Sequence, residues 1–289
     1  MNSKYTILKN EPMSKHTSFR VGGLARQYFK PKSLENLVDF IKDNPGENMF
    51  WLGLGSNLLV RDGGINGTVI AQGSGMDLLS HQKNIVNSEV GVSCAKLARY
   101  CAKQGLYGLD FLAGIPGLLG GALAMNAGAF GGEIWPWVKS VVTINSSGEL
   151  NNRTPDDYII SYRSVVSKHD FKEWFVSAEF ALENKSNKQN IKSLLAKRND
   201  SQPIGLPSCG SVFKNPQNNH AAKLIDLSGL KGFCLGKACV SEKHANFIIN
   251  TGGATAIDIE NLIIHIQEVV LKNHAVNLET EVKIVGDLL

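Results

Sequence analysis

Paired cysteines are scarce in this chain of 289 residues. It holds five cysteines, an odd number, and no two of them have the C-x-x-C spacing. Structural zinc sites usually need such a spacing together with a second ligand pair, so we expect no bound metal. Residues 1–10 also lack the pattern of a signal peptide. We therefore expect reduced thiols, as in a cytoplasmic protein, at Cys94, Cys101, Cys209, Cys234 and Cys239.

Charge of one sign is not in large excess either. The 30 Lys and Arg residues against 26 Asp and Glu residues leave a formal net charge of +4. This excess is too small to argue for nucleic acid as a partner, although it suits anionic small molecules. With 43% hydrophobic and 19% charged residues, the composition is that of an ordinary globular protein. The length suggests about two domains.

The common nucleotide-binding fingerprints are absent as well. Residues 51–70 are W-L-G-L-G-S-N-L-L-V-R-D-G-G-I-N-G-T-V-I, in which Gly53 and Gly55 match the start of G-x-G-x-x-G but Leu58 stands at the third glycine. The Walker spacing G-x-x-x-x-G-K-[ST] does not occur. The pattern over residues 50–60 instead predicts a strand, a tight turn whose N–H groups form an anion nest, and a second strand. A nucleotide bound here would need a different fold.

A long apolar stretch is present, but glycine interrupts it. The chain is uncharged between Asp110 and Glu133, and it contains Pro116 and five glycines within residues 114–128. Glycine removes side chains where another group lies against the backbone. We therefore expect a flat cofactor with a pyrophosphate to lie on this segment. A transmembrane helix is disfavoured by Pro116, Asn126 and the glycines, whereas a packing corner without a ligand remains the alternative.

Hydrophobic periodicity predicts helices and strands in mixed order. Apolar residues at helical spacing behind Ser or Thr caps indicate helices, and alternation with a period of two indicates strands. The expected helices cover residues 34–43, 93–104, 188–198 and 255–274, and the expected strands cover residues 138–144, 174–182 and 281–285. Because they do not alternate regularly, we expect an α+β fold rather than a doubly wound sheet.

Several motifs, in a fixed order, carry a resemblance to one family. They are H-T-S-F-R-V-G-G at 16–23, L-G-L-G-S-N-L-L-V at 52–60, G-I-P-G-L-L-G-G with M-N-A-G-A at 114–129, Y-R at 162–163, G-S-V-F-K-N-P at 210–216, L-S-G-L-K-G at 227–232 and V-S-E-K-H-A-N-F at 240–247. Together they span most of the chain, from Thr17 to Val285. The chain resembles the UDP-N-acetylenolpyruvoylglucosamine reductase (MurB) family.

The resemblance implies an α+β fold built on FAD. A p-cresol methylhydroxylase-type FAD-binding domain would have two lobes, residues 1–78 and 79–182. A C-terminal α+β substrate-binding domain, residues 183–289, would follow, with the option that its last strand returns to the first lobe. Neither glycine segment contains His or Cys, so we expect FAD to be bound without a covalent link. The implied FAD contacts are Gly53, Gly55, Ser56, Asn57, Leu58, Ile115, Pro116, Gly117, Gly120, Gly121, Asn126, Gly128 and Ala129. In particular, a side chain at Gly120 is expected to enter the space of the pyrophosphate.

The resemblance also implies a reaction and its residues. NADPH would reduce FAD, and the reduced flavin would reduce the enolpyruvyl ether of UDP-N-acetylglucosamine to UDP-N-acetylmuramate. The implied catalytic residues are Arg163, Ser211 and Glu281. Arginine suits the charge that develops on the enolate and carboxylate, serine can deliver a proton if neighbouring charge assists it, and the glutamate would assist at the site. The implied substrate-binding residues are Tyr162, Arg163, Lys214, Asn215 and His244.

Two departures from the family pattern and two rival functions remain. Val165 stands where the family often has a serine, and the stretch between Arg163 and Ser211 has room for only one strand and one helix. This matches the shorter branch of the family, which lacks the inserted tyrosine loop. The rival functions are a flavin oxidase of the same superfamily and a nucleotide-sugar-binding module without flavin. We expect a cytoplasmic protein, favour a monomer, and expect no nucleic acid and no membrane span.

Overall fold

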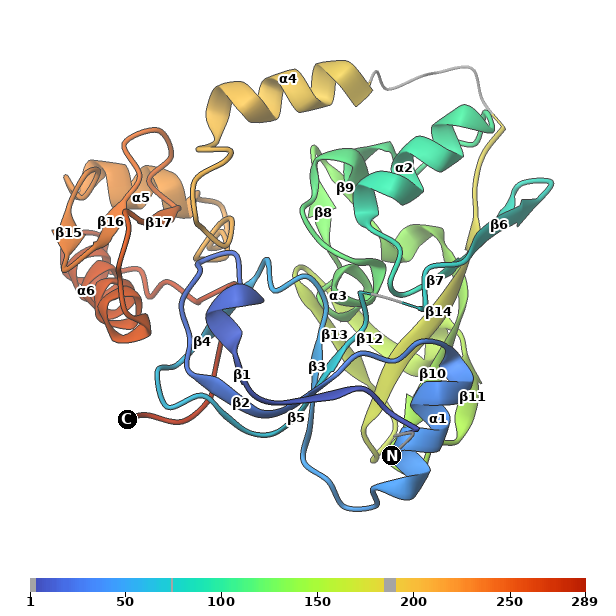
Figure 1. Cartoon of the computed structure of the whole chain (residues 1–289). Coiled ribbons are helices and arrows are strands. Elements are labelled where there is room, and N and C mark those ends of the chain that lie inside the picture. Colours follow the sequence, from blue (N-terminus) through green and yellow to red (C-terminus); the bar gives the residue numbers. More distant parts are fainter. Residues whose placement is uncertain (1–3, 74, 185–190) are drawn as a thin grey trace. The chain divides into compact units, whose positions relative to one another are not determined.

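The structure is a computed structural model that describes residues 4–73, 75–184 and 191–289 (Figure 1). Helices and strands are mixed without a regular alternation, which confirms the expected α+β class. The helices are α1 (Leu34–Asp43), α2 (Cys94–Lys103), α3 (Leu119–Ala124), α4 (Ile191–Ser201), α5 (Ala221–Leu227) and α6 (Ala256–His274). Short 3-10 turns are η1 (Met13–Lys15), η2 (Asp110–Gly114), η3 (Trp135–Trp137) and η4 (Pro155–Asp157). In these described ranges, no helix combines the length and the apolar character that crossing a membrane demands.

The strands are mostly short. They are β1 (Ile7–Pro12), β2 (Leu24–Phe29), β3 (Met49–Leu52), β4 (Leu58–Val60), β5 (Ile65–Ala71), β6 (Leu79–Gln82), β7 (Ile85–Glu89), β8 (Gly128–Ala129), β9 (Gly132–Glu133), β10 (Val138–Asn145), β11 (Leu150–Arg153), β12 (Tyr158–Ser161), β13 (Ser164–Ser167), β14 (Glu173–Ala181), β15 (Cys234–Leu235), β16 (Ala238–Val240), β17 (Ile248–Asn250) and β18 (Lys283–Val285). One sheet has the order β1-β2-β5-β3, and the largest has the order β11-β10-β14-β7-β6.

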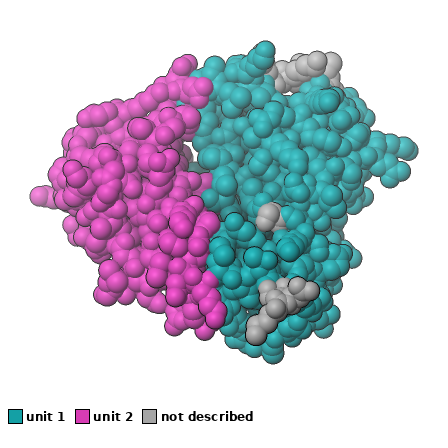
Figure 2. Space-filling model, in the orientation of Figure 1, with its two compact units in different colours: residues 1–8, 27–54, 67–198 teal, residues 9–26, 55–66, 199–289 magenta. Residues whose placement is uncertain are grey.

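The chain divides into two compact units, which Figure 2 distinguishes by colour. Unit 1 comprises Met1–Leu8, Gln27–Leu54 and Gly67–Arg198, and unit 2 comprises Lys9–Arg26, Gly55–Asn66 and Asn199–Leu289. The chain passes from unit 1 to unit 2 between Leu54 and Gly55, inside the first glycine segment. The three-part division of the sequence at residues 78 and 182 stays a prediction.

Unit 1 is built around the five-stranded antiparallel sheet and two capped helices. β10 pairs with β14 and β14 with β7, and the apolar faces of these strands join one core. Both expected helices are confirmed, because the side chain of Ser33 accepts the N–H of Asn36 before α1 and Ser93 accepts that of Lys96 before α2. The two caps satisfy N–H groups of the first turn and mark where each helix begins.

Unit 2 is built around helix α6, which lies against β15 and β16 (Figure 1). Thr255 and Asp258 form the expected capping box, with both hydrogen bonds in place. The apolar stripe of α6 is buried as expected at Ile259, Leu262, Ile263, Ile266 and Val270. The final strand β18 pairs in parallel with β4, so that Lys283 lies opposite Leu58.

Two sequence-based expectations about elements need adjustment. The predicted helix at 188–198 begins in residues 188–190, which lie outside the described residues, and α4 runs three residues further, to Ser201. The expected single strand between Arg163 and Ser211 is wrong, because β13 precedes β14 there. The short β13 pairs only with β12, and such local hairpins leave a weak period-two signal.

The expectation of five reduced thiols is wrong for one pair. Cys234 and Cys239 lie opposite each other on β15 and β16 and form a disulfide. The sequence separation of the two cysteines does not predict this disulfide, because the register of β15 and β16 is what brings them together. Cys94, Cys101 and Cys209 are free and buried, and burial raises the pKa of each thiol to about 12.

Candidate functional site

The first glycine segment forms the expected turn between two strands. β3 ends at Leu52, the turn covers residues 53–57, and β4 begins at Leu58. Gly55 has a left-handed backbone (φ +68°), and a Cβ there would lie 2.0 Å from the carbonyl oxygen of His16. The carbonyl oxygen of Gly55 accepts the N–H of Ser18 at 3.0 Å. Only glycine fits this position, and the motif at 16–23 is attached to the turn through this hydrogen bond.

The second glycine segment approaches the first within unit 1. A Cβ on Gly53 would lie 3.9 Å from the Cβ of Leu118 and 4.0 Å from the backbone nitrogen of Gly121. Gly121 is exposed, and a Cβ built on it meets nothing within 4 Å. Two stretches of bare backbone therefore adjoin each other with open space beside them. A flat, elongated group carrying a pyrophosphate fits such a surface.

Gly120 faces the other way. Its N–H donates to the carbonyl oxygen of Val90 at 3.0 Å. A Cβ on Gly120 would lie 2.6 Å from Oε1 of Gln72 and 3.1 Å from the Cβ of Val90. A side chain at this position would therefore meet Gln72 and Val90 of the same unit, and the expected contact of Gly120 with a pyrophosphate stays a prediction. At Gly120, α3 packs closely against Gln72 and Val90 and leaves no room for a side chain. The open position is its neighbour Gly121.

The loop before α3 is more accessible than the helix itself. Ile115 is half-buried and Pro116 is exposed. Gly117 accepts the N–H of Cys94 through its carbonyl oxygen at 2.9 Å, which attaches the loop to the start of α2. These three positions present backbone and small apolar groups beside the bare surface at Gly121.

Asn126 lies in the interior of unit 1. Its exposed fraction is 0%, and its backbone is left-handed (φ +46°). The side-chain nitrogen donates to Oε2 of Glu133 at 2.8 Å and to the carbonyl oxygen of Ser161 at 3.1 Å. The side-chain oxygen accepts the N–H of Trp135 at 3.4 Å. The polar atoms of this side chain are therefore engaged by unit 1 itself.

Arg163 occupies the turn between β12 and β13. Ser161 and Ser164 pair across the hairpin, so Tyr162 and Arg163 form its two-residue loop. The guanidinium donates to the carbonyl oxygen of Gly128 at 2.7 Å and to that of Asn126 at 3.3 Å. It also lies over the ring of Tyr162, 5.0 Å from the centroid. The structure thus joins Arg163 to the second glycine segment, where Gly128 and Ala129 form β8.

In unit 2, the segments that carry Ser211 and Glu281 pair with each other. Glu281 donates its N–H to the carbonyl oxygen of Val212 at 2.7 Å, and Lys214 donates to that of Glu279 at 2.9 Å. The expected strand 281–285 starts later, at Lys283, because Glu281 and Val282 are bound to Val212 instead of to β4.

The rest of the first glycine turn joins this cluster. The side-chain nitrogen of Asn57 donates to the carbonyl oxygen of Glu281 at 3.0 Å. Cys209 is buried, and its thiol donates to the carbonyl oxygen of Leu58 at 3.3 Å. Ser56 is half-buried on the turn itself. Unit 2 therefore holds Ser211, Glu281 and Asn57 on directly bonded segments.

Sequence reasoning missed Asn246, which fixes the loop of Ser211. Asn246 is buried and exchanges two hydrogen bonds with the backbone of Phe213, at 2.9 and 2.8 Å. Its own carbonyl oxygen accepts the N–H of Val212 at 2.9 Å. The signal was present in the block V-S-E-K-H-A-N-F, where a polar side chain interrupts an apolar run.

The expected substrate-binding residues of unit 2 differ in their surroundings. Lys214 pairs with Glu279 at 3.3 Å, and the exposed Asn215 accepts the N–H of Ala221 through its side chain at 3.1 Å. His244 is half-buried, and its Nδ1 is buried without a hydrogen-bond partner among the described residues. Burial lowers the pKa of His244, and the positive charge of Lys231 lowers it further. His244 is therefore neutral near pH 7.

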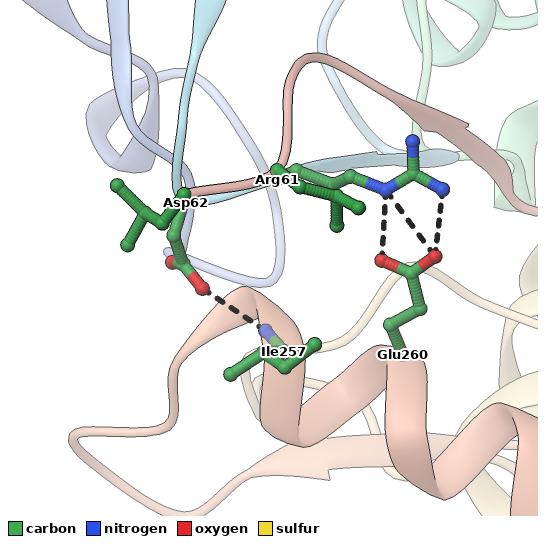
Figure 3. Close-up of a pocket in the computed structure, with 6 residues that line it drawn as sticks. Arg61, Asp62, Ile257 and Glu260 are labelled. Atoms are coloured by element: carbon green, nitrogen blue, oxygen red, sulfur yellow. Dashed lines mark hydrogen bonds and ion pairs between the residues drawn. The ribbon is translucent and has the colours of Figure 1, made fainter.

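A separate cavity of about 240 Å³ in unit 2 is lined by none of the expected site residues (Figure 3). Arg61 binds Glu260 with two-pronged geometry, and Asp62 accepts the N–H of Ile257 at the start of α6. Leu288 and Leu289 complete its lining. The polar groups of this cavity are engaged with one another, so they serve to hold the start of α6.

Two family models match separate parts of this chain. Residues 25–152 match the model of the FAD binding domain, and residues 202–285 match that of the UDP-N-acetylenolpyruvoylglucosamine reductase C-terminal domain.

Full-length relatives extend this match. A UDP-N-acetylenolpyruvoylglucosamine reductase of Alkalilimnicola ehrlichii is 52% identical and that of Methylococcus capsulatus is 49% identical, over 96% and 99% of this chain and 94% and 95% of theirs. The crystal structure of the Thermus caldophilus reductase matches with a TM-score of 0.82 and 29% identity, over 97% of this chain and 98% of that one. The resemblance expected from the motifs is confirmed: the chain belongs to the UDP-N-acetylenolpyruvoylglucosamine reductase family and carries its FAD-binding domain.

Proposed function

We propose that this protein is a cytoplasmic flavoenzyme that uses NADPH to reduce UDP-N-acetylglucosamine enolpyruvate to UDP-N-acetylmuramate, a precursor of peptidoglycan. The observation that carries the proposal is the 52% identity over 96% of the chain to a reductase of this name. The bare glycine surface of unit 1 supports it independently, because a packing corner without a ligand would not need open space beside Gly53 and Gly121.

FAD would lie on the glycine segments without a covalent bond. Gly53 and Gly121 would offer bare backbone, residues 55–58 the N–H groups of the first turn, and residues 115–117 and 128–129 the flanking loops. Bound FAD supplies the hydride that reaches the substrate. The chain's own contribution is to hold the cofactor by backbone groups and to exclude side chains from its path.

Arg163 would bind the carboxylate of the enolpyruvyl group and hold the negative charge that develops next to it. A guanidinium stays charged at neutral pH and meets a carboxylate with a planar pair of donors. Carbonyl oxygens of Asn126 and Gly128 hold the cation in place. An already oriented cation needs little reorganisation when the charge appears, which is the main source of electrostatic catalysis.

Ser211 would donate the proton that completes the reduction, and Glu281 would assist it. The serine follows Gly210, whose left-handed backbone (φ +71°) shapes the turn. A free serine hydroxyl is a weak acid, so a neighbouring group must support the transfer. Glu281 is a suitable neighbour in unit 2, because its backbone is bonded to the residue that follows Ser211.

Tyr162, Lys214, Asn215 and His244 would bind the rest of the nucleotide sugar. Lys214 offers a positive charge for the diphosphate, although it must leave or share its ion pair with Glu279. Tyr162 is exposed on the hairpin of Arg163. The Nδ1 of His244, which has no hydrogen-bond partner in the part of the chain that the structure describes, can accept a hydrogen bond from a sugar hydroxyl or donate one to it, depending on its tautomer.

The deciding experiment mixes the purified protein, NADPH and UDP-N-acetylglucosamine enolpyruvate without oxygen and identifies the product by mass. We expect UDP-N-acetylmuramate, two hydrogens heavier than the substrate. A protein that oxidises NADPH only when oxygen is admitted would be the rival flavin oxidase. A colourless protein that cannot be reconstituted with FAD, yet binds the nucleotide sugar, would be the rival binding module.

A further inference from the structure

We propose that Asn126 is a positioning residue for Arg163 rather than a contact of the cofactor. The proposal rests on the function proposed for Arg163, and it goes beyond it by naming what holds that cation in a productive orientation. Three features of unit 1 carry it: the backbone of Arg163, the acceptors of its guanidinium, and the hydrogen bonds of Asn126.

Arg163 adopts a backbone that suits glycine or asparagine better than arginine. It has a φ of +55° and is the second residue of the two-residue loop between Ser161 and Ser164. A long side chain is disfavoured in the left-handed region and persists there only where the surroundings determine it. The hairpin therefore needs attachments that hold this turn.

The guanidinium of Arg163 is held by main-chain acceptors of one short segment. It donates to the carbonyl oxygens of Asn126 and Gly128. A Cβ on Gly128 would lie 3.1 Å from Nη1 of Arg163 and 2.4 Å from the carbonyl oxygen of Gly132. The absence of a side chain at Gly128 lets the cation approach. Its position is consequently set by where residues 126–128 lie.

Asn126 fixes both ends of this arrangement at once. Its side-chain nitrogen donates to the carbonyl oxygen of Ser161, two residues before Arg163, and to Oε2 of Glu133 on the neighbouring β9. Its own carbonyl oxygen receives Arg163. The base of the hairpin and an acceptor of the guanidinium thus belong to one fully buried residue. A shift of Asn126 would move the turn and the cation together.

The amide is needed because it supplies two donors to two acceptors. A carboxylate in its place would face the carbonyl oxygen of Ser161 and the carboxylate of Glu133 without a proton to share. Asn126→Asp keeps the size and the tolerance of a left-handed backbone, and it replaces the two donors by acceptors that carry a negative charge. Glu133→Gln is the matched control, since Asn126 can donate to the amide oxygen of glutamine as it does to a carboxylate.

The test follows the flavin absorbance of the FAD-loaded protein by stopped flow in two steps, reduction by NADPH and reoxidation by UDP-N-acetylglucosamine enolpyruvate. We expect Asn126→Asp to bind FAD and to be reduced as the wild type is. Its reoxidation by the substrate should be slower by roughly 10- to 100-fold, the scale for a misplaced reacting group. Glu133→Gln should behave as the wild type. The double variant Asn126→Asp/Glu133→Gln should recover part of the loss, because the glutamine amide can donate to the new carboxylate.

Several outcomes would overturn the proposal. Reoxidation of Asn126→Asp at the wild-type rate would do so, and so would an equal loss in both steps or a loss of FAD, which would indicate a structural or a cofactor-binding role. If Asn126→Asp does not fold, Asn126→Gly keeps the left-handed backbone and applies the same test. A wild type that is not reoxidised by the enolpyruvyl substrate would instead contradict the proposed function.

Discussion

The backbone N–H of Glu281 donates to the carbonyl oxygen of Val212 over 2.7 Å, so Glu281 is attached to the residue that follows Ser211. Because this bond joins main-chain atoms, a change of the Ser211 side chain should leave the pairing of the two segments intact. Ser211→Ala keeps the backbone of both segments, and we expect reduction by NADPH to proceed nearly as in the wild type. Reoxidation by the enolpyruvyl substrate should be slower by at least roughly 100-fold, as for the loss of a positioned acid.

Ser211→Cys is the companion variant, because a thiol can also donate a proton, and part of the activity should be retained. Stopped-flow absorbance separates the two steps. Unchanged reoxidation in Ser211→Ala would show that Ser211 is an ordinary turn residue and would direct attention to Glu281.

The neighbouring glycines Gly120 and Gly121 should respond oppositely to substitution. Gly121→Val adds a side chain to the open surface, so we expect a folded protein that has lost most of its FAD. Gly120→Ala pushes a methyl group against Gln72 and Val90, so we expect a loss of about 1–3 kcal/mol in the free energy of unfolding, the scale for overpacking. The flavin-to-protein absorbance ratio and a urea titration measure the two effects. Full FAD occupancy in Gly121→Val would place the cofactor elsewhere.

The disulfide between Cys234 and Cys239 should stabilise unit 2 only under oxidising conditions. Cys239→Ser should lower the free energy of unfolding by roughly 2 kcal/mol in buffer without reductant, the loop-closure scale for so short a loop. In dithiothreitol the wild type and the variant should coincide. A titration that finds five reactive thiols in the denatured, unreduced wild type would contradict the crosslink.

The lowered pKa of His244 predicts a pH dependence with a definite sign. Its folded-state pKa lies below the ordinary value, so protons bind more readily to the unfolded chain. The corresponding stabilisation is present above the unfolded-state pKa of about 6.5 and is lost as the pH falls toward the folded-state value. His244→Gln should therefore lose less stability than the wild type between about pH 7 and pH 5. The exposed His81→Gln serves as control, and equal losses in all three proteins would exclude a role for His244.

Local sequence signals sufficed for several elements. Ser33 and Ser93 predicted the starts of α1 and α2, and the pair Thr255 and Asp258 predicted that of α6, because caps act within one turn of the chain. The strand–turn–strand at residues 50–60 was also predictable, since the glycines mark the turn.

Tertiary arrangement decided what the sequence could not show. The direction of Gly120 depends on how α3 packs against Gln72 and Val90, and neither partner is near it in the chain. The engagement of the Asn126 side chain likewise depends on Ser161, 35 residues away. The motifs identified which residues belong to the candidate site, but not which of them face a cofactor and which support a neighbour.

The division into two units has an optical consequence. The four tryptophans and six tyrosines of the chain all fall in unit 1, among them Trp51 and Trp174, whose rings stack with centroids 4.9 Å apart. Unit 2 has neither residue type, yet it contains α6, the longest helix of the described ranges. Intrinsic fluorescence therefore monitors unit 1 alone, whereas circular dichroism at helical wavelengths includes unit 2. Denaturation curves recorded by the two signals will superimpose if the halves of this protein unfold as one, and will separate if either half can persist without the other.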